Sequence, residues 1–172
     1  MGNLALLLVR ATLGLFMAGH GAQKLFGWFD GPGIEGTAGF MESLGLRPGK
    51  PWAIIGGASE FGGGVLTLLG LLNPLGSLGV IGAMAMATTK VHANNPIWVT
   101  EGGAELPVTN SAIATALMMT GPGKLSLDRA FGIRVPRWVT FVGFVTIAVV
   151  VAYARGEEAG SQQDPAEEGG GE

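Results

Sequence analysis

The sequence predicts an all-α protein, a bundle of transmembrane helices. Of its 172 residues, 48% are hydrophobic and 13% are charged, whereas a soluble domain is about 25% charged. The mean hydropathy is +0.43, and apolar runs long enough to cross a bilayer recur along the chain. Glycine supplies 31 residues without a collagen-like period, and small residues within apolar runs are typical of closely packed membrane helices.

The first apolar run covers about residues 3–26. It lacks a basic n-region, and Arg10 interrupts its apolar core, so we expect a retained helix rather than a cleaved signal peptide. A long connection over residues 27–51 follows. Within it, residues 36–44 place apolar side chains at helical spacing, which predicts a short helix lying on the membrane surface.

Four further apolar runs complete the predicted bundle. The second span is expected over residues 52–72, the third over 75–91 and a shorter fourth over 109–125. The fifth run, residues 138–154, is at the lower limit of length for a span. Tryptophans fall near the ends of these runs, as in an aromatic belt: Trp28, Trp52, Trp98 and Trp138.

Charge in the connections predicts the orientation. The strongest basic cluster lies in the 124–137 loop, which places that loop and the N-terminus in the cytoplasm of a plasma-membrane protein. Arg47 and Lys50 lie in the 27–51 connection, which this orientation places outside, and they favour the reverse orientation. Residues 156–172 hold six acids and no base, which predicts a disordered tail, outside the cell if the fifth run spans. Nothing in the chain indicates a nucleic-acid partner.

Glu60 is the only acidic residue of the second run. A carboxylate at membrane depth is costly unless it is paired or neutral, so it is a candidate functional group. We therefore assign Glu60 as the candidate proton-handling residue. The alternative is a structural partner that fixes the register of two helices.

Most other polar residues of the spans are expected in the same half of the membrane. With each run centred on the bilayer and a rise of 1.5 Å per residue, Glu60 lies about 3 Å outward and Arg10 about 7 Å inward. The remaining candidates lie outward, namely His20 by about 7 Å, Lys24 by about 13 Å, Lys90 by about 10 Å, and Asn110 at the start of the fourth run. Glu60 is expected to face the first helix and to pair with His20, Lys24 or Arg10.

No metal site is expected. The chain has no cysteine and two histidines, which excludes cysteine-bound zinc and iron–sulfur ligation by this chain. His20 and His92 could in principle hold a haem, but a hydrogen bond from His20 to Glu60 is the favoured interpretation.

Three motifs occur in order over residues 3–128. Arg10 and Gly14 precede Gly-His-Gly-Ala-Gln-Lys-Leu-Phe-Gly at 19–27, Glu-Phe-Gly-Gly-Gly follows at 60–64, and Gly-Pro-Gly-Lys-Leu-Ser-Leu-Asp at 121–128. They resemble the first helix, the Glu-x-Gly-Gly motif and the closing Gly-Pro-Gly-x-x-Ser-Leu-Asp of the DoxX family.

The resemblance implies a four-helix membrane domain over residues 1–128, followed by a basic loop and additional helix (129–155) and the tail. It also implies a respiratory or redox-stress role. Some family members resemble small subunits of a quinone-reducing thiosulfate oxidoreductase, and others are linked to complexes with superoxide dismutase and a sulfurtransferase. The expected ligand is a quinone, bound near Glu60 and positioned by Arg10, His20 and Lys24. The expected partners are lipid and either a membrane redox complex or further copies of the chain.

Two other functions are compatible with the sequence. The first is a structural anchor or assembly factor whose charged residues serve only helix packing. The second is a small-molecule binding or transport protein with Glu60 in the substrate path, although no inverted repeat is visible. The sequence shows a proton-handling group without an electron carrier, so it leaves open whether the protein is an enzyme.

Overall fold

The computed structural model describes residues 2–162, and every regular element in this part of the chain is helical. The predicted all-α fold is therefore confirmed. Seven α-helices are α1 Asn3–Phe26, α2 Gly33–Ser43, α3 Gly49–Leu69, α4 Leu75–Met86, α5 Glu105–Thr120, α6 Leu127–Phe131 and α7 Trp138–Gln162. Three short turns join them, namely η1 Trp28–Asp30, η2 Ala87–Val91 and η3 Val99–Glu101.

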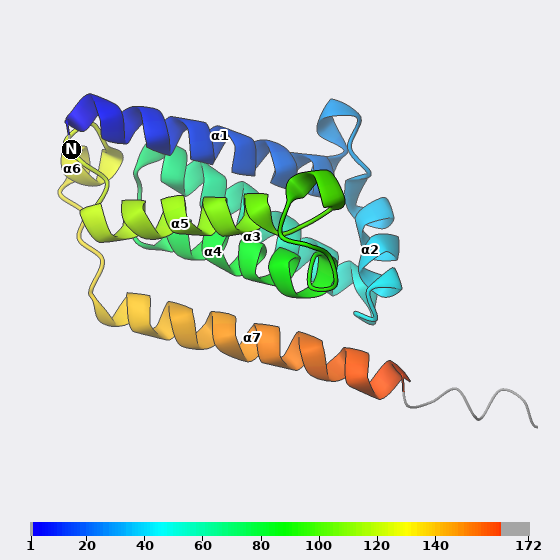
Figure 1. Ribbon diagram of the computed structural model, residues 1–172. Coiled ribbons are helices and arrows are strands. Elements are labelled where there is room, and N and C mark those ends of the chain that lie inside the picture. The colour runs from blue at the N-terminus through cyan, green and yellow to red at the C-terminus, as the bar shows by residue number, and fades with distance from the viewer. Residues whose placement is uncertain (1, 163–172) are drawn as a thin grey trace, which may run out of the picture.

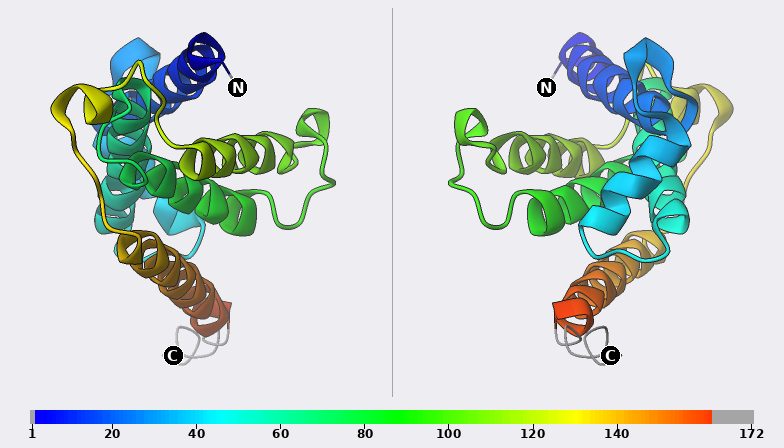
Figure 2. Two further views of the ribbon diagram at one scale, coloured as in Figure 1. Left: turned by 90° about the vertical axis from the view of Figure 1, so that its left-hand side faces the viewer. Right: turned by 90° about the vertical axis from the view of Figure 1, so that its right-hand side faces the viewer.

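The long helices run alternately up and down, with α1, α4 and α7 in one direction and α3 and α5 in the other (Figure 1). The 27–51 and 92–108 connections therefore lie at one end of the bundle, and α6 lies at the other (Figure 1). Seen along the helices, α4 and α5 project to one side, and α7 lies on the far side of the bundle from α1 (Figure 2). For clarity we call the end that carries α2 the α2 end, and the opposite one the α6 end.

Three helices are long and apolar enough to cross a membrane, namely Asn3–Phe26, Gly49–Leu69 and the Trp138–Gly156 part of α7. The apolar stretch Leu75–Val91, made of α4 and η2, is shorter. The predicted fourth span, 109–125, is shifted, because α5 begins at Glu105 and ends at Thr120, before Gly121 and Pro122. Helix α7 continues into the acidic segment as far as Gln162. The rest of the predicted disordered tail, residues 163–172, lies outside the described residues.

The first and third helices approach each other through glycine, as their sequences predict. A Cβ added at Gly21 would lie 2.3 Å from the Phe61 backbone nitrogen, and one at Gly64 would lie 2.3 Å from that of Ala18. Both distances are far shorter than a van der Waals contact. The two backbones are thus in direct contact, as small residues at a helix interface allow.

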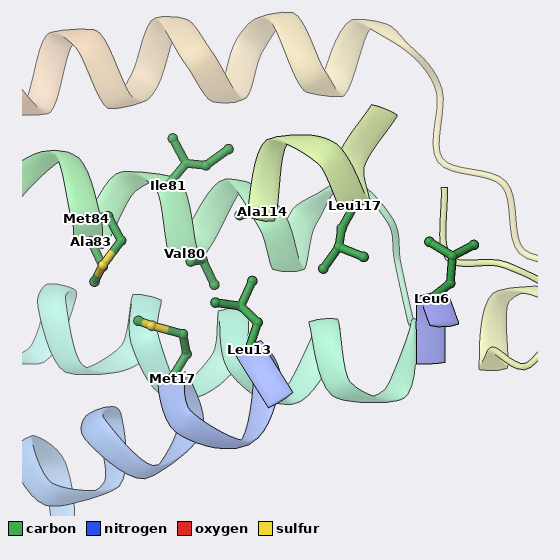
Figure 3. Close-up of a cluster of buried hydrophobic side chains, with 9 residues drawn as sticks. All are labelled: Leu6, Leu13, Met17, Val80, Ile81, Ala83, Met84, Ala114 and Leu117. Carbon is green, nitrogen blue, oxygen red and sulfur yellow. The ribbon is translucent and has the colours of Figure 1, made fainter. Parts of the chain in front are cut away.

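The apolar core lies between α1, α4 and α5. Figure 3 shows its buried side chains, which are Leu6, Leu13, Met17, Val80, Ile81, Ala83, Met84, Ala114 and Leu117. Met17 and Val80 are almost fully buried. This core holds the α4–α5 hairpin against α1 and so leaves the other face of α4 free to contact α7.

Candidate functional site

A cavity of about 210 Å³ lies between the helices near the α2 end. Helix α2 contributes Phe40 and Met41, the segment after it contributes Leu44 and Leu46, and α3 contributes Trp52, Ile55, Gly56, Ser59 and Glu60. The other walls come from Lys24 of α1, from α4 and η2, and from α7. The lining is mainly apolar, with a few polar groups that converge on one space, as expected for a ligand-binding site.

Glu60 and Lys24 form an ion pair in the wall of this cavity. The Lys24 Nζ donates to Glu60 Oε1, and the side chains are 32% and 5% exposed, respectively. Lys24 lies in the last turn of α1 and Glu60 in the middle of α3, so the glycine contact of these helices brings the two groups together. Of the partners that the sequence left open for Glu60, the structure places Lys24 against it.

The second carboxylate oxygen of Glu60 is buried and has no hydrogen-bond partner among the described residues. A buried acceptor left without a donor costs about 1–3 kcal/mol. Because Glu60 also lines the cavity and the terminal torsion of a glutamate is broad, a turn of the carboxylate would present this oxygen to a donor carried by a molecule in the cavity. This unsatisfied oxygen is the feature of the site that most directly indicates a ligand.

Lys90 reaches the same cavity from η2, a π-helical turn. Its Nζ donates to the Ala154 carbonyl of α7 at 3.2 Å, which ties η2 to α7. π-Helical turns are rare and often occur at functional sites. The sequence predicts Lys90 as a site residue but gives no indication of the π-helical turn.

Two residues predicted for the site lie outside it. His20 is exposed on α1, so the favoured hydrogen bond from His20 to Glu60 is wrong. Lys24, one turn beyond His20 on α1, is the residue whose side chain reaches Glu60. The Asn110 amide lies 4.0 Å from the Met17 sulfur and 3.8 Å from the Met84 sulfur, within the core. Neither His20 nor Asn110 lines the cavity.

Arg10 belongs to a separate cluster at the α6 end, so an ion pair with Glu60 is also wrong. It is 4% exposed. Its guanidinium donates to the carbonyl oxygens of Leu68 at 3.2 Å, of Leu125 at 2.5 Å, and of Pro122. Arg10 and Lys24 are separated by about 21 Å along α1. Arg10 therefore ties the α3 terminus to the segment after α5 and does not reach the cavity.

Asp128 explains the last of the three motifs. Its carboxylate accepts hydrogen bonds from the backbone N–H groups of Leu72 at 2.7 Å and Asn73 at 2.8 Å. Leu72 has a positive φ of 53°, a conformation that needs external support in a non-glycine residue. Ser126 caps α6 by accepting from the Arg129 N–H at 3.3 Å. This motif thus fastens the α3–α4 turn to α6.

The three long apolar helices of the described residues define a multi-pass helical membrane protein. The DoxX family model matches residues 5–93, just over half of the chain, and the chain belongs to that family. The match covers α1 to η2, with Lys24, Glu60 and Lys90. It leaves out α5, the motif at residues 121–128 and α7. No curated protein and no solved structure matches the chain.

Proposed function

We propose that the protein is a small subunit or partner of a quinone-linked oxidoreductase complex and that it binds the quinone headgroup in the Lys24–Glu60 cavity. The observation that carries this proposal is the buried Glu60 oxygen without a partner at the wall of a mainly apolar cavity. The DoxX membership and the membrane spans agree with such a role but do not by themselves define a reaction.

The polar groups of the cavity suit a quinone and its reduced form. The Lys24 ammonium is a donor for a quinone carbonyl, and the free Glu60 oxygen is an acceptor for a quinol hydroxyl. The volume of about 210 Å³ exceeds that of an engineered apolar cavity of about 150 Å³ that binds benzene. A single six-membered ring therefore fits, with its polar edge toward the ion pair.

The chemistry divides between this chain and a partner. Reduction of a quinone to a quinol takes up two electrons and two protons. Lys24 would donate one proton to a ring oxygen, Glu60 would donate the other after it takes up a proton from water, and both groups would then be reprotonated from water. The electrons would come from a redox partner, which makes the protein one component of a complex.

A structural anchor is the second candidate. It is favoured by the α6 end, where Arg10 and Asp128 bind backbone groups of the same chain. On this reading the Lys24–Glu60 pair would serve the same purpose, and the cavity would be filled by lipid.

Extraction of bound quinone separates the two candidates. The native protein and a Glu60→Gln variant would be purified in mild detergent, and the quinone per protein would be measured. Glu35→Gln is the matched control, because Glu35 forms an exposed ion pair with Lys50 at 2.6 Å on the surface. We expect bound quinone in the native protein and the control, and at least a tenfold loss in Glu60→Gln. Equal amounts of bound quinone in the native protein and both variants would favour the anchor. So would a native protein that forms a stable complex with a partner but binds no quinone.

A further inference from the structure

Helix α7 forms one side of the cavity. Four of its residues line the space, namely Thr146, Ile147, Val150 and Val151. The helix lies on the opposite side of α3 and α4 from α1 (Figure 2). It also lies outside the part of the chain that the family model matches. Without this helix the cavity would open sideways to the hydrocarbon of the membrane.

The two edges of α7 are held differently. One edge packs on α4, where a Cβ at Gly143 would lie 2.5 Å from a methyl carbon of Leu78 and one at Gly82 would lie 3.4 Å from Ile147. At the other edge, toward α3, the ring of Tyr153 stacks on that of Trp52 at 6.1 Å. Helix α7 packs mainly on α4 and η2, so its edge toward α3 is the less tightly packed one.

Most of α7 is exposed to the surroundings of the bundle. Only 6% of its most apolar window is buried, compared with 33% for α1 and for α3. Its outer side chains are apolar and include Phe141, Val145 and Val149. A chain of methylene or prenyl groups that leaves the cavity beside α7 therefore meets mainly apolar surface and lipid.

We infer that α7 is the specificity-determining wall of this cavity, and that the ligand is a headgroup with an apolar tail that passes into the membrane between α3 and α7. The inference rests on the proposed quinone site and adds the tail and its route. Two other sides of the cavity are closed. The α1–α3 side is closed by direct backbone contact at the glycines, and α2 packs against both α1 and α3.

A substitution in the wall tests the inference. Val150→Phe places a ring on the α7 wall, three residues before Tyr153 at the edge toward α3, and so beside the proposed route of the tail. Val149→Phe places the same ring on the outer face, where Val149 is 61% exposed. The probes are a benzoquinone without a tail and the same benzoquinone with a decyl tail, added to protein in nanodiscs. Binding is followed by quenching of Trp52 fluorescence, in a background where Trp28, Trp98 and Trp138 are changed to Phe.

The native protein is expected to bind both probes. Val150→Phe is expected to weaken binding of the decyl probe at least tenfold more than that of the tailless probe, and Val149→Phe to leave both within twofold. Equal weakening of both probes, or none, would overturn the inference while the quinone site stands. If the native protein binds neither probe, the proposed function falls, and the inference falls with it.

A cross-link gives a second test that does not depend on how Val150→Phe folds. Because the chain has no cysteine, Trp52→Cys with Tyr153→Cys can be joined by a short reducible thiosulfonate linker across the α3–α7 edge. Release of decyl-benzoquinone, measured by extraction over time, is expected to slow at least tenfold in the linked protein. A reductant is expected to restore it. Release at the same rate before and after reduction would overturn the proposed route.

Discussion

Replacement of Arg10 tests the separation of the two polar clusters. Arg10→Met keeps most of the aliphatic stem and removes the guanidinium that binds the carbonyl oxygens of Leu68, Pro122 and Leu125. A hydrogen bond to a charged group contributes about 1.5–3 kcal/mol, but burial of the guanidinium opposes part of that gain. Removal of the guanidinium also leaves buried carbonyl oxygens without a donor, which costs about 1–3 kcal/mol for each one that stays unsatisfied. We therefore expect a loss of about 3 kcal/mol in the free energy of unfolding.

The loss can be measured by unfolding in mixed micelles of a mild detergent and dodecyl sulfate, followed by circular dichroism. Arg134→Met is the matched control, since Arg134 is exposed at the same end of the bundle, and surface substitutions usually change stability by less than about 0.5 kcal/mol. A loss below about 1 kcal/mol in Arg10→Met would refute the structural role. The variant that remains folded is expected to keep its bound quinone. Loss of quinone with unchanged stability would instead restore the ligand-positioning role that the sequence predicts.

Three further predictions concern the helix contact, the ion pair and the orientation. Gly21→Ala is expected to destabilise the bundle by about 1–3 kcal/mol, whereas Gly62→Ala, with nothing within 4 Å of its Cβ, is expected to be neutral or stabilising in the same unfolding assay. Lys24→Met is expected to destabilise the native protein more than it destabilises the Glu60→Gln variant, with a coupling energy of about 1–3 kcal/mol. Additive effects of the two substitutions would contradict the ion pair. Arg134→Cys is expected to react with an impermeant maleimide only after cells are permeabilised, and labelling of intact cells would reverse the predicted orientation.

The boundaries of the membrane helices could be predicted where helix-breaking residues such as proline interrupt an apolar run. Asn73-Pro74 separates α3 from α4, and the predicted run 75–91 coincides with α4 and η2. The fourth helix is shifted because Leu106-Pro107 reads as part of a polar connection, whereas proline is tolerated in the first turn of a helix. Short α6 was not predicted, since its few residues carry no periodic pattern.

The site was only partly predictable because side-chain charge and depth indicate distance along a helix and not direction around it. Lys24 and Glu60 were both predicted in the outward half of the membrane, and the structure brings them together. Arg10 was assigned to the same site because a sequence does not show which backbone carbonyls a side chain binds, and its partners in the structure are such carbonyls. The position of α7 was unpredictable for another reason. Lipid is as apolar as the interior of the bundle, so an apolar pattern cannot distinguish the face that lines a cavity from the face that contacts lipid.

The two ends of the bundle satisfy their buried charges in opposite ways. At the α6 end, Arg10 and Asp128 have their hydrogen-bonding groups taken up by backbone atoms of the same chain. At the α2 end, Glu60 is equally buried but has one oxygen without a partner beside a cavity. A group needed only for helix packing would be stabilised by the first arrangement. The second leaves a buried acceptor without a donor at an energetic cost, which a ligand that carries a donor would relieve.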